Sequence, residues 1–126
     1  MKITRSMLAV VCLAAGANAA AGALEECMIK GDQDAVTRCL VEQDREAQAA
    51  LNKAEGDAAK KARELDVATG RSGAAVALAK TMRGFVDYRK AQCDFVRAMY
   101  PGPGADQRQL GCVVDMTRRR VRDLQN

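Results

Sequence analysis

The stretch that decides the fold reads MRGFVDYRKAQCDFVRAMYPGPGADQRQLGCVVDMTRRRVRDL and covers residues 82–124. It holds all four aromatic residues of the chain, and Cys93 and Cys112 flank its Pro-Gly-Pro-Gly turn. On a helical wheel the apolar side chains of residues 82–100 cover about half of the circumference, and charged side chains cover the rest. This pattern predicts an amphipathic helix with a wide buried face.

Two polar residues, Arg89 and Gln92, lie inside the apolar arc of that helix. An unpaired charge there would be costly to bury. Arg89 therefore either reaches the rim with its stem packed on Phe85 or Tyr88, pairs with a carboxylate of a neighbouring helix, or binds a ligand. A structural use is favoured over a ligand-binding one.

The Pro-Gly-Pro-Gly sequence after Tyr100 ends the helix, because neither proline nor paired glycines continue one. Asp106 is predicted to cap the next helix, which runs to about Leu124. The apolar side of that helix comprises Leu110, Val113, Val114, Thr117, Val121 and Leu124. Cys93 lies eight residues before Pro101 and Cys112 eight residues after Gly104, so the two cysteines come level in an antiparallel hairpin. We predict a Cys93–Cys112 disulfide.

The first residues have the form of a secretory signal peptide. Lys2 and Arg5 precede a short apolar run, and Ala17-Asn18-Ala19 is a cleavage site of the A-x-A kind. Cleavage after residue 19 or after residue 23 would fit equally well. In either case the helical domain is predicted to cover residues 24–126. Cys12 lacks the small preceding residue of a lipoprotein signal, so no lipid anchor is expected. The mature chain is expected in the periplasm or secreted.

Without Lys2 and Arg5, 18 basic residues face 16 acidic ones, which gives a net charge of +2. This near balance predicts neither nucleic-acid binding nor membrane adhesion, and no later run is long enough for stable membrane insertion. The arginines of residues 118–122 are interpreted as a solvated helix face, since no aromatic residue accompanies them.

Four cysteines remain after processing, an even number suited to an oxidising compartment. Cys27 and Cys39 lie symmetrically about the turn at Gly31–Asp34, as Cys93 and Cys112 do about the Pro-Gly-Pro-Gly turn. We therefore predict a Cys27–Cys39 disulfide. The chain has no histidine and no C-x-x-C motif, which argues against a metal site, and no cofactor is expected.

Residues 34–69 are rich in alanine and charge, and they predict one long helix with small contact residues. Its stripe comprises Leu40, Asp44, Ala47, Leu51, Ala54, Ala58, Ala62 and Leu65. Residues 70–73 close it, with Ser72 as the expected cap of the following helix. No strand pattern is present. The predicted fold class is therefore all-α, a small helical bundle of antiparallel hairpins stapled by two disulfides.

Catalytic chemistry is not indicated. The only serine after the leader is Ser72, in a turn, and the carboxylates lie on solvated helix faces without a converging pair. We predict that the protein is not an enzyme.

The cysteine framework and several spaced residues resemble the lysozyme inhibitor LprI-like family of small exported bacterial proteins. The matching residues are Cys27, Cys39, Leu51, Asn52, Tyr88, Arg89, Cys93, Cys112, Thr117, Arg120 and Leu124. The resemblance covers the domain from Cys27 to Leu124. The chain departs from the family at Phe85, where members often carry tryptophan, at Gln48, often aspartate, and at Glu55, often tyrosine.

The resemblance implies an all-helical, disulfide-stapled domain that inhibits lysozyme by protein–protein contact. The two cysteine-pinned turns are the candidate contact surfaces, because a pinned loop loses little entropy on binding. The alternative is a periplasmic structural or interaction module that serves another envelope protein without binding lysozyme. A turn with clustered carboxylates or an exposed aromatic anchor would favour the inhibitor. The oligomeric state does not follow from the sequence.

Overall fold

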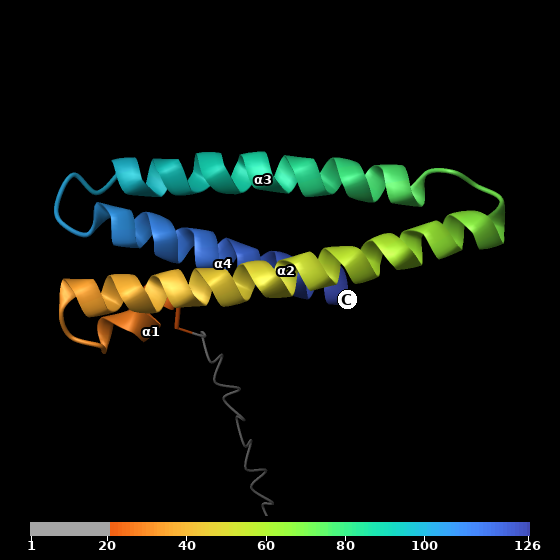
Figure 1. The fold of residues 1–126 in the computed structure, drawn as a ribbon. Helices are drawn as coiled ribbons and strands as arrows, with labels where there is room; N and C mark the ends of the chain where they lie inside the picture. The colour runs from red at the N-terminus through yellow and green to blue at the C-terminus, as the bar shows by residue number, and fades with distance from the viewer. Residues whose placement is uncertain (1–20) are drawn as a thin grey trace, which may run out of the picture.

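The computed structural model describes residues 21–126, so the predicted signal peptide at residues 1–19 lies outside the described residues. The described chain forms four helices and no strand: α1 Ala23–Met28, α2 Gln33–Thr69, α3 Ala74–Ala98 and α4 Ala105–Gln125. Each helix runs back along the one before it, and α4 lies between the first half of α2 and the second half of α3 (Figure 1). The predicted all-α bundle of antiparallel hairpins is confirmed.

The ends of α2 match the prediction closely. Asp32 accepts a hydrogen bond from the Ala35 amide at 2.8 Å and caps the first turn. Gly70 ends the helix in the left-handed conformation, with φ of 63°, which glycine adopts without a steric penalty. The long alanine-rich helix is therefore a single continuous element.

The two predicted caps of the later helices are wrong. Ser72 does not cap α3; instead the Asp66 carboxylate accepts hydrogen bonds from the amides of Ala74 at 3.0 Å and Ala75 at 3.1 Å. These bonds hold the pKa of Asp66 below its usual range, because they stabilise the ionised form. Asp106 does not cap α4 either, because its carboxylate pairs with Arg97 at 2.6 Å.

Both predicted disulfides are present. Cys27 is bonded to Cys39 with their Cα atoms 5.7 Å apart, and Cys93 to Cys112 with theirs 5.6 Å apart. The first bond joins α1 to α2, and the second joins α3 to α4. The turns at the centres of these two hairpins are thus each closed by a covalent bond.

The short helix α1 was not predicted. Its residues Ala23 and Cys27 are fully buried, and the Ala23 amide donates a hydrogen bond to Asp115 of α4 at 2.9 Å. The hydrophobic core lies where α1, α2 and α4 meet. It consists of Ala23, Cys27, Val36, Leu40, Ala47 and Val114, with Leu24, Cys39 and Leu110 packed against it.

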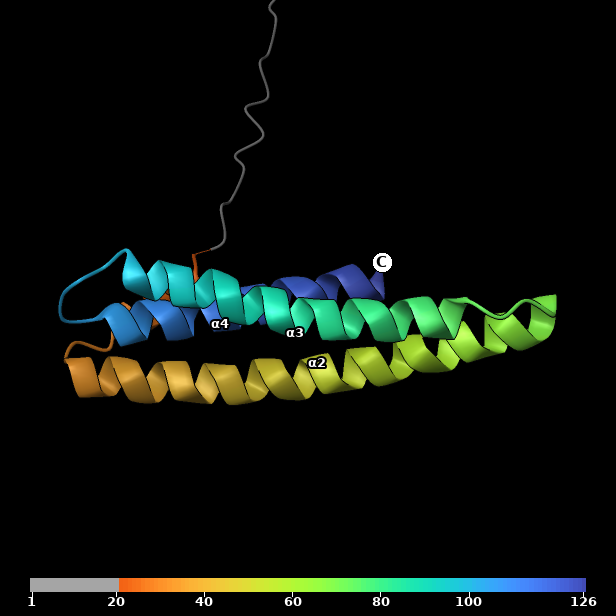
Figure 2. The ribbon, with the colours of Figure 1, turned by 90° about the horizontal axis from the view of Figure 1, so that it is seen from above.

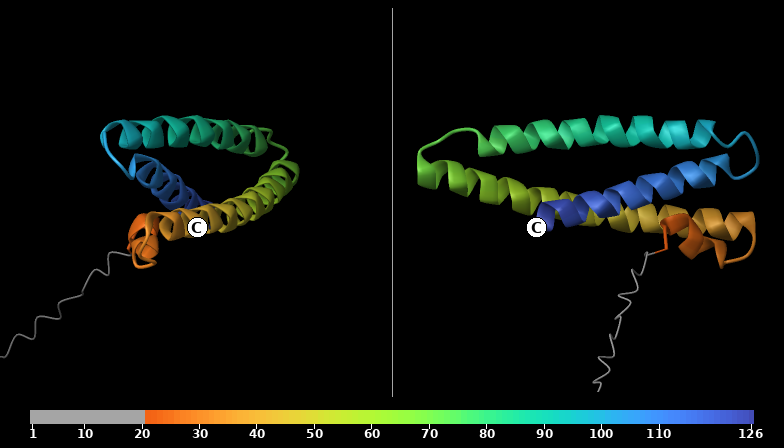
Figure 3. Two further views of the ribbon diagram at one scale, coloured as in Figure 1. Left: turned by 60° about the vertical axis from the view of Figure 1, so that its left-hand side comes forward. Right: turned by 180° about the vertical axis from the view of Figure 1, so that it is seen from behind.

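The prediction of a wide buried face on residues 82–100 is wrong. Cys93 is the one fully buried residue of α3, whereas Tyr88, Phe95 and Met99 are 61%, 56% and 61% exposed. The reason is the layering of the helices. Helices α2 and α4 both lie below α3 in Figure 1 and in the left view of Figure 3, so they cover only part of its apolar arc. The view from above shows α3 with no helix in front of it (Figure 2).

Helix α2 is longer than the core that it supports. Its buried residues lie between Val36 and Ala54. Beyond the C-terminal end of α4, α2 runs beside α3 alone (Figure 3, right). The predicted contact stripe of α2 is therefore buried in its first half, while Leu65 near its end is 56% exposed.

Candidate functional site

Four polar side chains join the three long helices through a chain of hydrogen bonds. The Arg89 guanidinium donates from Nη1 to the Thr117 hydroxyl at 2.6 Å and to the Gln48 amide oxygen at 3.2 Å. Gln48 in turn donates to the Asn52 amide oxygen at 3.0 Å, and the Thr117 hydroxyl donates to the Val113 carbonyl at 2.7 Å. Thr117 is fully buried, so this network is part of the packing between helices.

This hydrogen-bond network shows which of the three roles considered for the Arg89 side chain it has in the structure. Arg89 pairs internally, but its acceptors are an amide and a hydroxyl rather than the carboxylate that was considered. Its guanidinium also lies 5.2 Å from the centre of the Phe85 ring, as expected for a stem packed on that residue. Arg89 therefore has a structural role, which is consistent with the favoured interpretation.

Phe85 has two guanidinium groups near its ring. Besides that of Arg89, the Arg120 guanidinium lies 5.7 Å from the ring centre, and Arg120 Nη2 donates to the Thr81 hydroxyl at 2.8 Å. Arg120 thus connects α4 to the first half of α3, as Arg89 connects α3 to α2 and α4.

The other non-cysteine residues that match the family pattern do not join this network of hydrogen bonds. Leu51 is buried in the packing of α2, Leu124 is half-buried near the end of α4, and Tyr88 is exposed. Sequence reasoning noted Gln48 only as a departure from the family; its four-residue spacing from Asn52 was the available signal that the two side chains interact.

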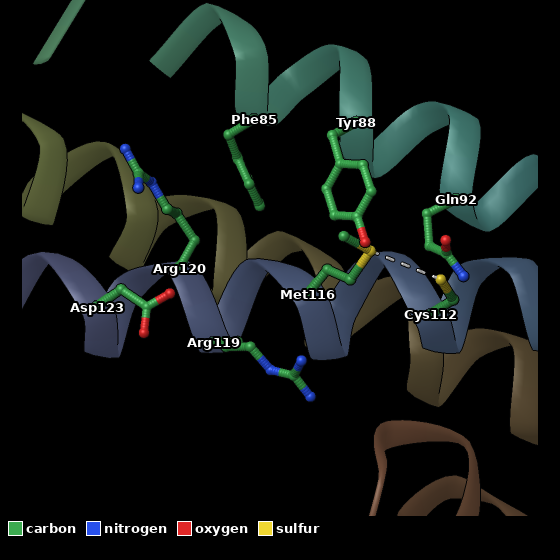
Figure 4. A pocket seen from close by; sticks show the side chains of 8 residues that line it. All are labelled: Phe85, Tyr88, Gln92, Cys112, Met116, Arg119, Arg120 and Asp123. Atoms are coloured by element: carbon green, nitrogen blue, oxygen red, sulfur yellow. Dashed lines mark hydrogen bonds between the residues drawn. The ribbon is translucent and has the colours of Figure 1, made fainter. Parts of the chain in front are cut away.

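A cavity of about 350 Å³ opens between α3 and α4 beside the network. It is lined by Phe85, Tyr88, Gln92, Cys112, Met116, Arg119, Arg120 and Asp123. Figure 4 shows Tyr88 pointing from α3 toward Met116, whose sulfur lies 3.9 Å from that of Cys112. Cys112 is disulfide-bonded and has no thiol proton, so this is a van der Waals contact. The guanidinium of Arg119 points away from Phe85 and Tyr88, so the cavity does not gather its cations around one point.

The two cysteine-pinned turns lie together at one end of the molecule (Figure 1). Gln107, just after the second turn, donates hydrogen bonds to the Gln33 carbonyl at 3.0 Å and to the Thr37 hydroxyl at 3.0 Å, both just after the first turn. Residues of both turns, including Gly31 and Pro103, line one cleft of about 250 Å³. We call this part of the molecule, residues 28–34 and 99–108, the turn end.

The turn end carries exposed side chains of the kind that anchor protein contacts. Ile29 is 84% exposed and Tyr100 45% exposed, and the Arg108 guanidinium lies 4.0 Å above the Tyr100 ring. Two of the three carboxylates of this region are occupied locally, Asp32 in capping α2 and Asp106 in pairing with Arg97, and Asp34 is exposed. The turn end therefore presents an aromatic anchor rather than an acidic cluster.

The four carboxyl groups with clearly shifted pKa values do not have the electrostatics of a catalytic acid. Where a carboxyl pKa is clearly shifted, it is lowered, as for Asp94, whose main partner is the Lys90 ammonium at 2.6 Å. The other lowered groups are Glu42, Asp57 and Asp66. A general acid requires a raised pKa, so these four groups are not prepared for that role. Within residues 21–126, no helix is both long and apolar enough to span a membrane.

The comparisons with known proteins agree with the resemblance seen in the sequence. The family model described as "Lysozyme inhibitor LprI" matches residues 25–124. No curated protein and no solved structure matches the chain. The matched range includes all four disulfide cysteines and nearly the whole helical bundle, and the family is one of inhibitors rather than enzymes. The chain therefore belongs to the lysozyme inhibitor LprI family.

Proposed function

We propose that this chain is an exported inhibitor that binds lysozyme with its turn end. The observation that carries the proposal is the joining of two turns, distant in the sequence, into one end by Gln107. Membership of the lysozyme inhibitor LprI family supports the activity, and the geometry supports the surface.

The turn end suits an inhibitor because it is ordered before binding. Each turn is closed by a disulfide, and the hydrogen bonds of Gln107 hold the two turns against each other. A surface held in this way loses little conformational entropy when a partner covers it. Tyr100 supplies the large, half-exposed aromatic side chain that often dominates the energy of a protein interface.

In this proposal the affinity for lysozyme comes from short-range contacts rather than from long-range electrostatic attraction. With a net charge of +2 after removal of the leader, the chain does not attract a basic lysozyme from a distance. Association should therefore depend weakly on salt, and affinity should be set by how slowly the complex dissociates.

The leader and the disulfides support a place outside the cytoplasm, either periplasmic or secreted, where disulfides persist. Residues 1–19 are proposed to be removed on export, and the four-helix domain is the part that acts.

The test is a peptidoglycan lysis assay with lysozymes of several classes and the oxidised chain, expressed from Met1 and purified after export. We expect saturable inhibition at near-stoichiometric protein, lost after reduction and alkylation. Tyr100→Ala should raise the inhibition constant at least about tenfold, the size of an interface hot spot. The matched control is Tyr88→Ala, which removes another exposed tyrosine far from the turn end and should leave inhibition unchanged.

Equal losses in the two tyrosine variants would reject the turn end as the contact surface. Failure to inhibit any class of lysozyme would reject the proposed activity. The second candidate, an interaction module for another envelope protein, would then be favoured by the exposed apolar face of α3.

A further inference from the structure

Of the two polar residues in the apolar arc of α3, Gln92 has no part in the hydrogen-bond network that Arg89 joins. Its half-buried side chain points toward α4 and lines the cavity of about 350 Å³ between the two helices (Figure 4). Its side-chain amide makes no hydrogen bond to another group of residues 21–126. Two N–H donors and a carbonyl oxygen are therefore available to a molecule in this cavity.

A second polar group of the cavity wall also lacks a partner. The Nε atom of Arg120 is buried and has no acceptor in the described part of the chain, although Nη2 of the same guanidinium is bonded to Thr81. Buried donors without an acceptor are rare in folded proteins. Gln92 on α3 and Arg120 on α4 thus indicate a ligand that presents hydrogen-bonding oxygens.

Two links between α3 and α4 fix the walls of the cavity. The Cys93–Cys112 disulfide joins the helices toward one end, and the bond from Arg120 to Thr81 joins them toward the other. Thr81 and Cys93 lie about 18 Å apart along the axis of α3. Because the walls are fixed before a ligand arrives, binding costs little conformational entropy. The volume lies within the range of about 300–1,000 Å³ that is usual for small-molecule sites, which often occur between the helices of a bundle.

The lining combines apolar surface with both donors and acceptors. Met116 and Tyr88 supply the apolar surface, and the Tyr88 ring is open to a ligand because this residue is 61% exposed. Arg119 adds N–H donors and Asp123 adds acceptor oxygens, while Gln92 supplies both kinds of group. Between positions 21 and 126, no ion pair or hydrogen bond occupies the side chains of Arg119 and Asp123.

This composition selects among classes of ligand. A compact anion such as phosphate fits poorly, because Asp123 repels it and the Arg119 guanidinium points away from Tyr88 (Figure 4). A wholly apolar ligand would leave the Gln92 amide without a partner. We propose that the cavity binds an N-acetylated pyranose unit of a glycan strand. The choice of this sugar rests on the proposed function, because lysozyme cleaves strands of such sugars.

Each part of such a sugar has a counterpart in the cavity. The C–H face of the pyranose ring packs on the Tyr88 ring. The acetamido N–H and C=O pair with the Gln92 amide, and the acetamido methyl packs on the Met116 thioether. Arg119 and Asp123 remain for the ring hydroxyls. Residues of the turn end do not line this cavity, so the chain can hold glycan and lysozyme at the same time.

The test is an NMR titration of the oxidised chain, expressed from Met1 and purified after export, with chitotriose in the absence of lysozyme. We expect saturable shifts at the Gln92 side-chain amide and a Kd on the order of millimolar. Gln92→Leu should weaken binding at least about tenfold without lowering the melting temperature, because leucine suits the apolar arc. Tyr88→Ala should weaken binding similarly. The matched control is Tyr100→Ala, at the turn end, which should bind chitotriose as the unchanged chain does.

Cellotriose, which has the same linkage without acetamido groups, tests the sugar class and should bind at least about tenfold more weakly. Equal binding of the two trisaccharides, or no binding of chitotriose at about ten times the expected Kd, would overturn the proposal. Undiminished binding by Gln92→Leu would overturn it as well. In the dilute suspension of a lysis assay a millimolar site stays mostly empty, so Tyr88→Ala still serves as the control for inhibition. Because the titration contains no lysozyme, its failure leaves inhibition by the turn end intact, and a failed lysis assay leaves chitotriose binding intact.

Discussion

Arg89→Ala offers the most direct test of how the three long helices are held together. The substitution removes two hydrogen bonds from a charged donor, to the Thr117 hydroxyl at 2.6 Å and to the Gln48 amide at 3.2 Å. Hydrogen bonds to charged groups contribute about 1.5–3 kcal/mol each, and the longer bond and partial exposure of this pair reduce the sum. We expect a loss of about 2 kcal/mol in the free energy of unfolding. For a domain of this size, that lowers the melting temperature by about 8–16 °C.

The assay is thermal and denaturant unfolding followed by circular dichroism, with Arg83→Ala as the matched control. Arg83 is exposed on the same helix, and its removal should change stability only within about 0.5 kcal/mol. Thr117→Val removes the hydroxyl while keeping the shape of the buried side chain. Because the two residues share a bond, the effects of Arg89→Ala and Thr117→Val should not add. Additive effects, or equal stability of the Arg89 and Arg83 variants, would refute the proposed network.

Three further predictions concern other parts of the structure. Gln48→Asp should raise the melting temperature at neutral pH, because Arg89 then meets a carboxylate instead of a neutral amide; an unchanged value would show that the two side chains do not interact. The pKa of Asp66 is lowered in the folded state, so its contribution to stability is present above its unfolded pKa of about 3.9 and is lost as the pH falls through the lower folded value. Asp66→Asn should therefore reduce the loss of stability on acidification below about pH 4, measured by urea unfolding at each pH. Mass spectrometry of the exported chain should find Ala20 at its start, since the alternative cut would remove the buried Ala23; a start at Leu24 would contradict this.

The parts of the fold that the sequence predicted are those set by local chemistry. The helix predicted over residues 34–69 matches α2, Gln33–Thr69, because its alanine-rich pattern and its closing glycine are local signals; the Asp32 cap at its start was not predicted. The disulfides followed from the symmetric placement of cysteines about two turns, because antiparallel neighbours bring equidistant positions together.

The parts that the sequence did not predict depend on contacts between distant residues. The cap of α3 comes from Asp66, eight residues before Ala74, and a nearby serine gave a more obvious but wrong signal. Helix α1 has too few residues to show a period, and its burial depends on α4. The apolar arc of α3 was correctly recognised, but which part of the arc is covered depends on where its neighbours lie.

The candidate site could likewise be predicted only in part, because it also depends on contacts between distant residues. The two turns were recognised as pinned loops, yet their meeting at one end depends on a bond from Gln107 to Gln33, which no local pattern indicates. Tyr100 was seen as an aromatic residue of a turn, and its exposure became known only from the structure.

Residues of α2 are buried only along its first half, and this determines which part of the protein unfolds first. Beyond Ala54 no residue of this helix is fully buried, and both disulfides lie toward the other end of the molecule. The far part of the α2–α3 hairpin therefore unfolds locally at a lower free energy than the whole domain. Its amide hydrogens exchange with solvent first, and a protease cleaves first near the connection at residues 70–73. The cysteine-bridged half survives such a cut as a folded remnant, because the contacts and bonds that hold it do not pass through the lost segment.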